Sequence, residues 1–336
     1  MASKQHSGVS SSSKFKQEAD KIQATFFKTA KRHFLLMYMS LVIIISLSIS
    51  LLISFVVTAN TIIPAYLMMS LLIMIFFFLL FRIWVITQYP KLITRLRDRL
   101  IDMRAIINYQ EGVVQHHYWI AQKMCRFVDD MYSKTSVNTR VKFFSFLPAR
   151  NLYEQWLNER LNEWSESIVL AAANEYIKLI YYEPLNKDVH WQLADTYLYL
   201  ARMYQKRKDL VRTGIYMMLF QDEPRVVDSK KIHYAEKALQ EYEIIKRFGD
   251  PNKEIYIQSA SVYRLLNDPK KECQELEKSI SIDSDNLSQW FKLGVLYFQN
   301  GDVYRGLEVY KRLKSKRYEN ADKMMIFYAG NKHESQ

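Results

Sequence analysis

The hydrophobic pattern of the chain is dominated by one stretch, from Phe34 to Phe81, in which 48 successive residues carry no charge. Two apolar blocks lie in this region, residues 34–57 and 62–81, and the second continues to residue 86 if the side chain of Arg82 reaches the headgroups. At about 1.5 Å per residue, each block is long enough as a helix to cross a hydrocarbon core of about 30 Å. We therefore expect a two-helix transmembrane hairpin. Its predicted membrane residues include Phe34, Val57, Ile62, Phe81 and Arg82, the last extending to the headgroups.

Charge predicts the orientation of this hairpin. Seven Lys and Arg against two acidic residues precede the first block, and six against two follow Phe81 as far as Arg104. Basic residues close to spanning helices stay in the cytoplasm, so we expect an integral membrane protein with both termini cytoplasmic. The net charge of +12 is then mostly a signal for anionic lipid headgroups as partners, and it does not favour nucleic acid.

The first 33 residues are predicted to form a polar, basic N-terminus. Residues 1–13 are rich in serine, and we expect no fixed structure there. From Lys14 to Arg32 a helical pattern places Ile22 and Phe26 on one side and lysines on the other. Two interpretations stay open: a basic amphipathic helix lying on the anionic leaflet, or a simple extension of the first spanning helix.

Residues 88–150 are predicted to form a long helical connector. Steps of three and four residues trace a heptad-like seam through Leu96, Leu100, Met103, Ile107, Gln110, Val114, His117, Ala121, Met124, Val128 and Met131. One interpretation is a coiled coil that makes a homo-oligomer through residues 96–131. The other, which we favour because Gly112 interrupts the pattern, is a helix packed on the chain's own repeat domain. His117 is then a packed or hydrogen-bonded residue.

From residue 151 onward the sequence repeats at a 34-residue period, most clearly between 253–286 and 287–320. The matched positions include Tyr256 with Trp290, Ala260 with Gly294, Tyr263 with Tyr297, Asn267 with Gly301 and Leu276 with Tyr310. This pattern resembles the tetratricopeptide repeat (TPR) family, strongly over 253–320 and moderately over 153–252. The resemblance implies an all-α solenoid of stacked helix pairs, joined here to the hairpin.

Upstream units follow the same frame less closely. Ala194 and Tyr197 fit a first helix and Ala238 fits its second helix, but these halves are 32 residues too far apart, which predicts an insertion near 199–229. A further unit is predicted to begin at Tyr153. Its first helix carries Glu159, Arg160 and Glu163 where small or apolar residues belong, so it is interpreted as a repeat helix or a polar cap.

The resemblance implies a concave face built from first helices. The candidate partner-binding residues on it are Trp191, Asp195, Tyr199, Ile257, Arg264, Phe291, Val295 and Phe298. TPR proteins that clamp the C-terminal carboxylate of heat-shock chaperones place Lys and Asn where this chain has Phe291 and Val295, so that subclass is disfavoured. A hydrophobic or amphipathic protein segment is the expected partner. The alternative is that the chain's own residues 322–328, or its insertion, cover this face.

Catalysis finds little support in the sequence. Neither an HExxH motif nor a glycine-rich phosphate loop is present, and the two cysteines give no metal-binding pair. We therefore expect a membrane-anchored scaffold without catalytic residues, metal or cofactor. Two alternatives are kept: a secreted bacterial effector inserted in a host-derived membrane, and a membrane-bound enzyme that uses His116, His117 and Cys125.

Overall fold

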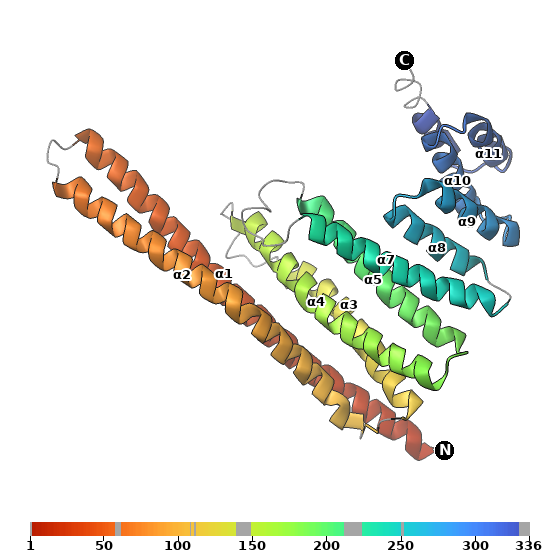
Figure 1. Cartoon of the computed structure of the whole chain (residues 1–336), viewed down its shortest axis with the longest axis horizontal. Helices are drawn as coiled ribbons and strands as arrows, with labels where there is room; N and C mark the ends of the chain where they lie inside the picture. Colours follow the sequence, from red (N-terminus) through yellow and green to blue (C-terminus); the bar gives the residue numbers. More distant parts are fainter. Residues whose placement is uncertain are drawn as a thin grey trace. The chain divides into compact units, whose positions relative to one another are not determined.

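The structure is a computed structural model that describes residues 2–57, 62–107, 109–110, 112–138, 149–211, 224–249 and 252–328. Every regular element within these ranges is a helix (Figure 1), which confirms the all-α prediction. The chain divides into two compact units, Met1–Glu175 and Tyr176–Gln336, called unit 1 and unit 2 below.

Unit 1 is built on two long helices that run side by side (Figure 1). Its elements are α1 (Ala2–Val57), α2 (Ile62–Asp102), the 3₁₀ helix η1 (Met103–Ile107), α3 (Val114–Asn138) and the larger part of α4 (Ala149–Tyr182), which continues into unit 2. The predicted boundaries at residues 33 and 87 do not appear in this structure, because α1 and α2 each run through them without a break. The serine-rich start, for which we expected no fixed structure, is part of α1.

The apolar side of the N-terminal part of α1 is buried inside unit 1. Phe15 packs edge-on against Trp119 of α3 at 5.3 Å between ring centroids, and Phe26 stacks on Trp164 of α4 at 4.4 Å. Ile22 is buried on the same side. This segment is therefore an extension of the first apolar helix, as one of the two interpretations proposed, and its apolar side faces protein.

Two helices of unit 1 are long and apolar enough to cross a membrane by length and composition. Their most apolar 18-residue windows have mean hydropathies of 2.5 and 2.6, and none of either window is buried. Leu52, Phe55 and Phe77 are each at least 60% exposed. Phe34, predicted as a membrane residue, is buried instead, because the rings of Tyr153 and Trp156 in α4 cover it.

The prediction of one long connector helix over residues 88–150 is wrong. The chain leaves α2 at Asp102, passes through η1, and turns before α3, with Gly112 in a backbone conformation of φ +91° that favours glycine. The two halves of the seam thus lie on different helices. Leu96 and Leu100 on α2 and Met124 and Met131 on α3 are at most 2% exposed, so these seam residues pack within the chain.

The positions at which helices begin in unit 2 confirm the predicted 34-residue period. Its last two helix pairs are α8 (Lys253–Leu265) with α9 (Pro269–Ile282), and α10 (Leu287–Gln299) with α11 (Val303–Ser315). The first helices α8 and α10 start 34 residues apart, and so do the second helices α9 and α11. Caps follow the same spacing, because Asn252 and Asn286 cap α8 and α10 while Asp268 and Asp302 cap α9 and α11.

The preceding helix pair is longer. It consists of α5 (Lys187–Val211) and α7 (Pro224–Arg247), with 25 and 24 residues against 13 or 14 in each later helix. The described part of the predicted insertion therefore lengthens both helices of one pair. Tyr204 and Tyr234 stack between them at 5.8 Å, and Tyr204 is fully buried. Residues 212–223, in the middle of the predicted insertion, lie outside the described residues.

The prediction of a helix pair that begins at Tyr153 is wrong, because α4 is a single helix over all of Ala149–Tyr182. The later pairs turn at Asn267 and Gly301, 34 residues apart, both with positive φ. Asparagine and glycine tolerate that conformation, whereas residues 150–183 contain neither Gly nor Pro to end a helix. Nothing therefore interrupts α4 at the position where a repeat would turn.

Candidate functional site

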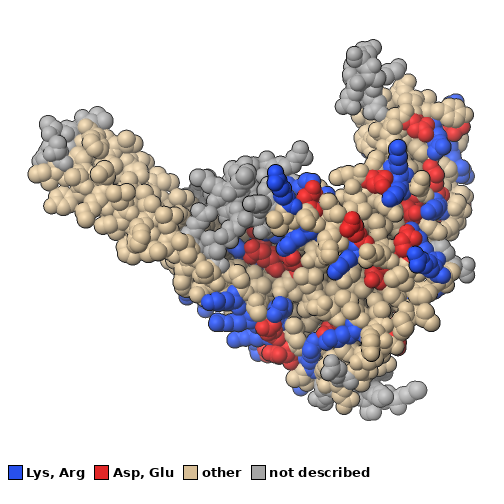
Figure 2. Space-filling view, in the orientation of Figure 1, with Lys and Arg blue, Asp and Glu red and all other residues tan. Residues whose placement is uncertain are grey.

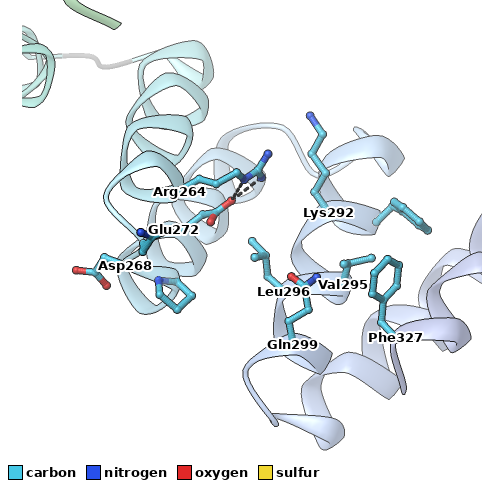
Figure 3. A pocket seen from close by; sticks show the side chains of 11 residues that line it. Arg264, Asp268, Glu272, Lys292, Val295, Leu296, Gln299 and Phe327 are labelled. Atoms are coloured by element: carbon cyan, nitrogen blue, oxygen red, sulfur yellow. Dashed lines mark hydrogen bonds and ion pairs between the residues drawn. The ribbon is translucent and has the colours of Figure 1, made fainter. Parts of the chain in front are cut away.

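An open groove of about 630 Å³ lies in unit 2 between the α8–α9 turn and α10. It is lined by Arg264, Asn267, Asp268, Pro269, Glu272, Phe291, Lys292, Val295, Leu296, Gln299 and Phe327. The turn at Asn267 brings the end of α8 and the start of α9 to one side, and α10 supplies the other side (Figure 3). Of the candidate residues, the groove brings together three: Arg264, Phe291 and Val295.

The α10 side of the groove is apolar. Phe291 and Val295 are one helical turn apart and partly buried, and Leu296 lies beside them. The ring of Phe291 is held by Tyr318 at 5.9 Å between centroids. Phe327, beyond the last helix pair, forms a further part of the wall (Figure 3). The groove can therefore take up an apolar side chain of moderate size.

The charged side chains of the groove differ in whether they are paired. Arg264 donates from Nε to Oε1 of the buried Glu272 at 2.7 Å, and this pair lies on the α8–α9 side (Figure 3). Lys292 on α10 is exposed and has no ion pair or hydrogen bond with the residues that the structure describes. The groove thus presents one uncompensated cation beside an apolar wall, which suits a ligand with an acidic group next to a large apolar one.

Burial raises the pKa of Glu272 above its ordinary value of 4.5, although the hydrogen bond and charge of Arg264 act in the opposite direction. The folded state therefore binds the proton of Glu272 more tightly than the unfolded state does. As a result, the ionised carboxylate reduces stability above the raised pKa, and this reduction disappears as pH falls toward and below 4.5.

We therefore expect Glu272→Gln to leave unit 2 at least as stable as the wild-type protein at pH 7. Any gain in the stability of the variant over the wild-type protein should shrink as the pH falls, because the wild-type carboxyl then becomes neutral as well. Thermal unfolding of both proteins at several pH values measures this difference. Glu319→Gln, at an exposed position, controls for the change in net charge. A large loss of stability for Glu272→Gln at pH 7 would contradict the expectation.

Phe298, a candidate binding residue, is a core residue. It is 0% exposed, because the ring of Tyr328 covers it at 5.6 Å and α11 passes close to its other edge. A Cβ atom at Gly306 of α11 would lie 2.5 Å from the Phe298 ring, so glycine is required for this close approach. Of the described C-terminal residues, Tyr328 thus covers Phe298 and Phe327 contributes a groove wall, and neither fills the groove.

The remaining candidate residues lie outside the groove. Tyr242, fully buried in α7, donates a hydrogen bond to Asp195 at 2.8 Å, and its ring contacts Trp191 at 5.8 Å. Burial raises the pKa of Asp195 despite this hydrogen bond. Tyr199 and Ile257 are partly buried on α5 and α8. These four residues line a different stretch of the first helices from the one that forms the groove.

Sequence reasoning missed several groove residues. Lys292 follows the candidate position of Phe291 directly, and Glu272 belongs to a second helix, so the first-helix pattern of the family did not include either of them. Phe327 lies after the last repeat, where no periodic signal exists. The first-helix positions of the TPR frame, Phe291 and Val295, were the signal that located the α10 wall.

The three residues of the enzyme alternative do not converge on one site. His117 is fully buried, with Nδ1 2.6 Å from Oε2 of Glu175, as expected for a hydrogen-bonded residue. His116 accepts a hydrogen bond from the backbone N–H of Gln110 at 3.1 Å. Cys125 is eight residues beyond His117 on α3, roughly 12 Å along the helix. Among the described residues, no group of three or more His, Cys, Asp or Glu is arranged to hold a metal ion.

Comparisons with known proteins give a limited result. No protein-family profile matches the chain, and no curated protein matches its sequence. Two solved structures with similarity are YrrB, a TPR protein with an unusual peptide-binding site, and TTC0263, a thermophilic TPR protein in Thermus thermophilus. YrrB is 13% identical over 52% of this chain and 76% of its own, and TTC0263 is 16% identical over 70% and 97%, each with a TM-score of 0.32. These values are too low to place any residue, so the repeat assignment rests on the 34-residue spacing of helices and caps.

Proposed function

We propose that the protein is a membrane-anchored helical-repeat scaffold that binds a protein segment in the groove of unit 2. The observation that carries the proposal is the combination of an unburied apolar hairpin with an open groove in one chain. Large apolar surfaces of this kind are not left in water, and a bilayer would cover the hairpin on all sides. The basic residues on both flanks of the hairpin support an orientation with both termini in the cytoplasm.

The anchoring part is tested on membranes from cells that make the full chain. We expect the protein to stay in the membrane fraction after an alkaline carbonate wash, which removes proteins attached only at the surface. Tags at the two ends should both be accessible to protease from the cytoplasmic side and protected from the other side. Release by carbonate, or opposite accessibility of the two tags, would contradict the proposed hairpin.

The groove supports a partner with an acidic group beside a large apolar side chain. The apolar group would lie against Phe291 and Val295, and the acidic group would face Lys292, which has no partner among the described residues. A bound segment in helical form could present both groups on one face, at positions three or four residues apart. Desolvated contacts of this kind give most of the affinity in small interfaces.

Binding is tested by selecting peptides from a random library on the full chain held in lipid nanodiscs. We expect selected peptides to combine Asp or Glu with Leu, Phe or Trp. Lys292→Glu should weaken their binding by about tenfold or more, because it replaces attraction by repulsion beside the apolar wall of the groove. Lys311→Glu on α11 is the matched control, exposed and outside the groove. Equal affinities for the two variants would refute groove binding.

A further inference from the structure

The residues around the hairpin form the longest acid-free part of the chain. From Lys21 to Arg97 the sequence contains no Asp or Glu, while it contains eight basic residues. These are Lys21, Lys28, Lys31, Arg32, Arg82, Lys91, Arg95 and Arg97. All eight lie on the two flanks of the uncharged stretch, so the positive charge gathers at one end of the hairpin.

Five of these cations are exposed and lie close to that end. Lys28, Lys31 and Arg32 are exposed on α1, and Lys91 and Arg95 are exposed on α2. They point away from the core because the opposite sides of the same helices carry the buried residues of unit 1. In Figure 2 the projecting arm shows no charged side chain on the face drawn, and blue side chains gather where it joins the rest of unit 1.

These five side chains have no ion pair or hydrogen bond with other residues in the part of the chain that the structure describes. Their nearest basic neighbours along the helices do have partners, since Lys21 pairs with Glu18 and Arg97 pairs with Asp98. His33 adds no charge at neutral pH, because burial together with the charges of Arg32 and Arg160 lowers its pKa below 6.5. The five-cation surface therefore has a charge that the described protein does not compensate.

The level of the five-cation surface corresponds to the headgroups of a bilayer. At 1.5 Å per residue, Arg32 lies roughly 6 Å beyond Leu36, the first exposed apolar residue of the α1 block, and Arg95 lies roughly 14 Å beyond the apolar block of α2. The polar layer on each side of a bilayer is about 5–8 Å thick, and charges interact across a further 8–10 Å of physiological salt solution. Trp84, 45% exposed at the same end of α2, is a residue type enriched at this interface.

We propose that the five-cation surface binds the headgroups of anionic phospholipids and so fixes how deeply the hairpin enters the bilayer. This proposal rests on the proposed membrane anchoring. The ligand is the phosphodiester of a lipid that carries net negative charge, which Lys and Arg recognise through charge and hydrogen bonds. The lipid tails would lie along the apolar face of the hairpin directly beyond the cations, so one molecule is complementary to both surfaces.

The test compares lipids retained by the purified full chain. The protein is reconstituted into phosphatidylcholine vesicles that contain a minor fraction of phosphatidylglycerol, extracted in mild detergent, and analysed for bound lipid by mass spectrometry. We expect phosphatidylglycerol to be enriched in the wild-type protein by about fivefold or more over the vesicle composition, the factor given by one interfacial cation. The five-cation variant should lose most of that enrichment. It carries Lys28→Gln, Lys31→Gln, Arg32→Gln, Lys91→Gln and Arg95→Gln.

A control variant removes the same number of charges from exposed positions of unit 2. It carries Arg247→Gln, Lys270→Gln, Lys311→Gln, Lys316→Gln and Lys323→Gln. We expect it to retain the wild-type enrichment. Equal loss in both variants, or no enrichment in the wild-type protein, would overturn the proposal. If the five-cation variant stays in the membrane fraction after a carbonate wash, its anchoring is intact. If the wild-type protein is released by the same wash, the proposed membrane anchor is itself contradicted.

Discussion

Replacing Trp164 by alanine is expected to destabilise unit 1 by about 3–5 kcal/mol, the range measured when a large buried aromatic side chain is truncated. Trp164 is 0% exposed and joins three helices, because it stacks on Phe26 of α1 and meets Phe127 of α3 edge-on at 5.5 Å. Hydrogen–deuterium exchange of the full chain in mild detergent measures the effect. Amides of α1 before residue 34 and of α3 should lose protection, while those of α8–α11 should keep it.

Two further variants make this prediction specific. Trp164→Phe should cost less than half as much, because it keeps a stacking ring and removes an indole N–H that has no hydrogen-bond partner among the described residues. Trp119→Ala, at the partly exposed contact with Phe15, should also have a smaller effect than Trp164→Ala. If Trp119→Ala were the more damaging change, Trp164 would not be the centre of this core.

Glu175→Gln is expected to destabilise unit 1 by roughly 3 kcal/mol, because it removes the carboxylate from a buried ion cluster. Glu175 is 3% exposed on α4, and it accepts from Arg104 of η1 and contacts His117 of α3. Tyr109 completes the cluster with its hydroxyl 3.2 Å from His117. The neutral amide keeps the shape but leaves the guanidinium of Arg104 without its counter-charge in a partly buried position.

The matched control for this change lies on the same helix. Glu163 pairs with Arg160 one turn away and is 31% exposed, so Glu163→Gln should change stability by less than about 1 kcal/mol. Urea unfolding of the full chain in mild detergent, followed by tryptophan fluorescence, compares the two variants. Similar effects of both substitutions would mean that the Glu175 cluster does not connect η1 to α3 and α4 in the way that its contacts indicate.

The sequence predicts best where one residue type decides the local structure. The unburied apolar helices follow from the absence of charge between Phe34 and Phe81, and the two last helix pairs follow from caps and turns at fixed spacing. Asn267 and Gly301 allow the turns, and the lack of any Gly or Pro within residues 150–183 explains why α4 continues through a predicted repeat boundary. This absence was visible in the sequence and could have corrected the prediction.

The remaining features depend on contacts between distant residues. Phe26 and Trp164 are far apart in the chain, and no local pattern indicates that their rings stack. The same holds for the burial of Phe298, which depends on Tyr328 and on the absence of a side chain at Gly306. The seam on α2 and α3 was recognised correctly as apolar, but its period could not show that the chain reverses near Gly112 and divides it.

The uninterrupted course of α1 past Phe34 has a mechanical consequence for an anchored protein. A flexible linker would isolate the part outside the bilayer from changes within it, whereas a continuous helix turns as one rod. From Phe34 to Phe15 the helix extends roughly 28 Å, so a change of about 10° in tilt inside the bilayer would displace Phe15 sideways by roughly 5 Å. Membrane helices adjust their tilt to hydrocarbon thickness, so in the proposed membrane-anchored state the local bilayer thickness would act on the aromatic contacts of unit 1.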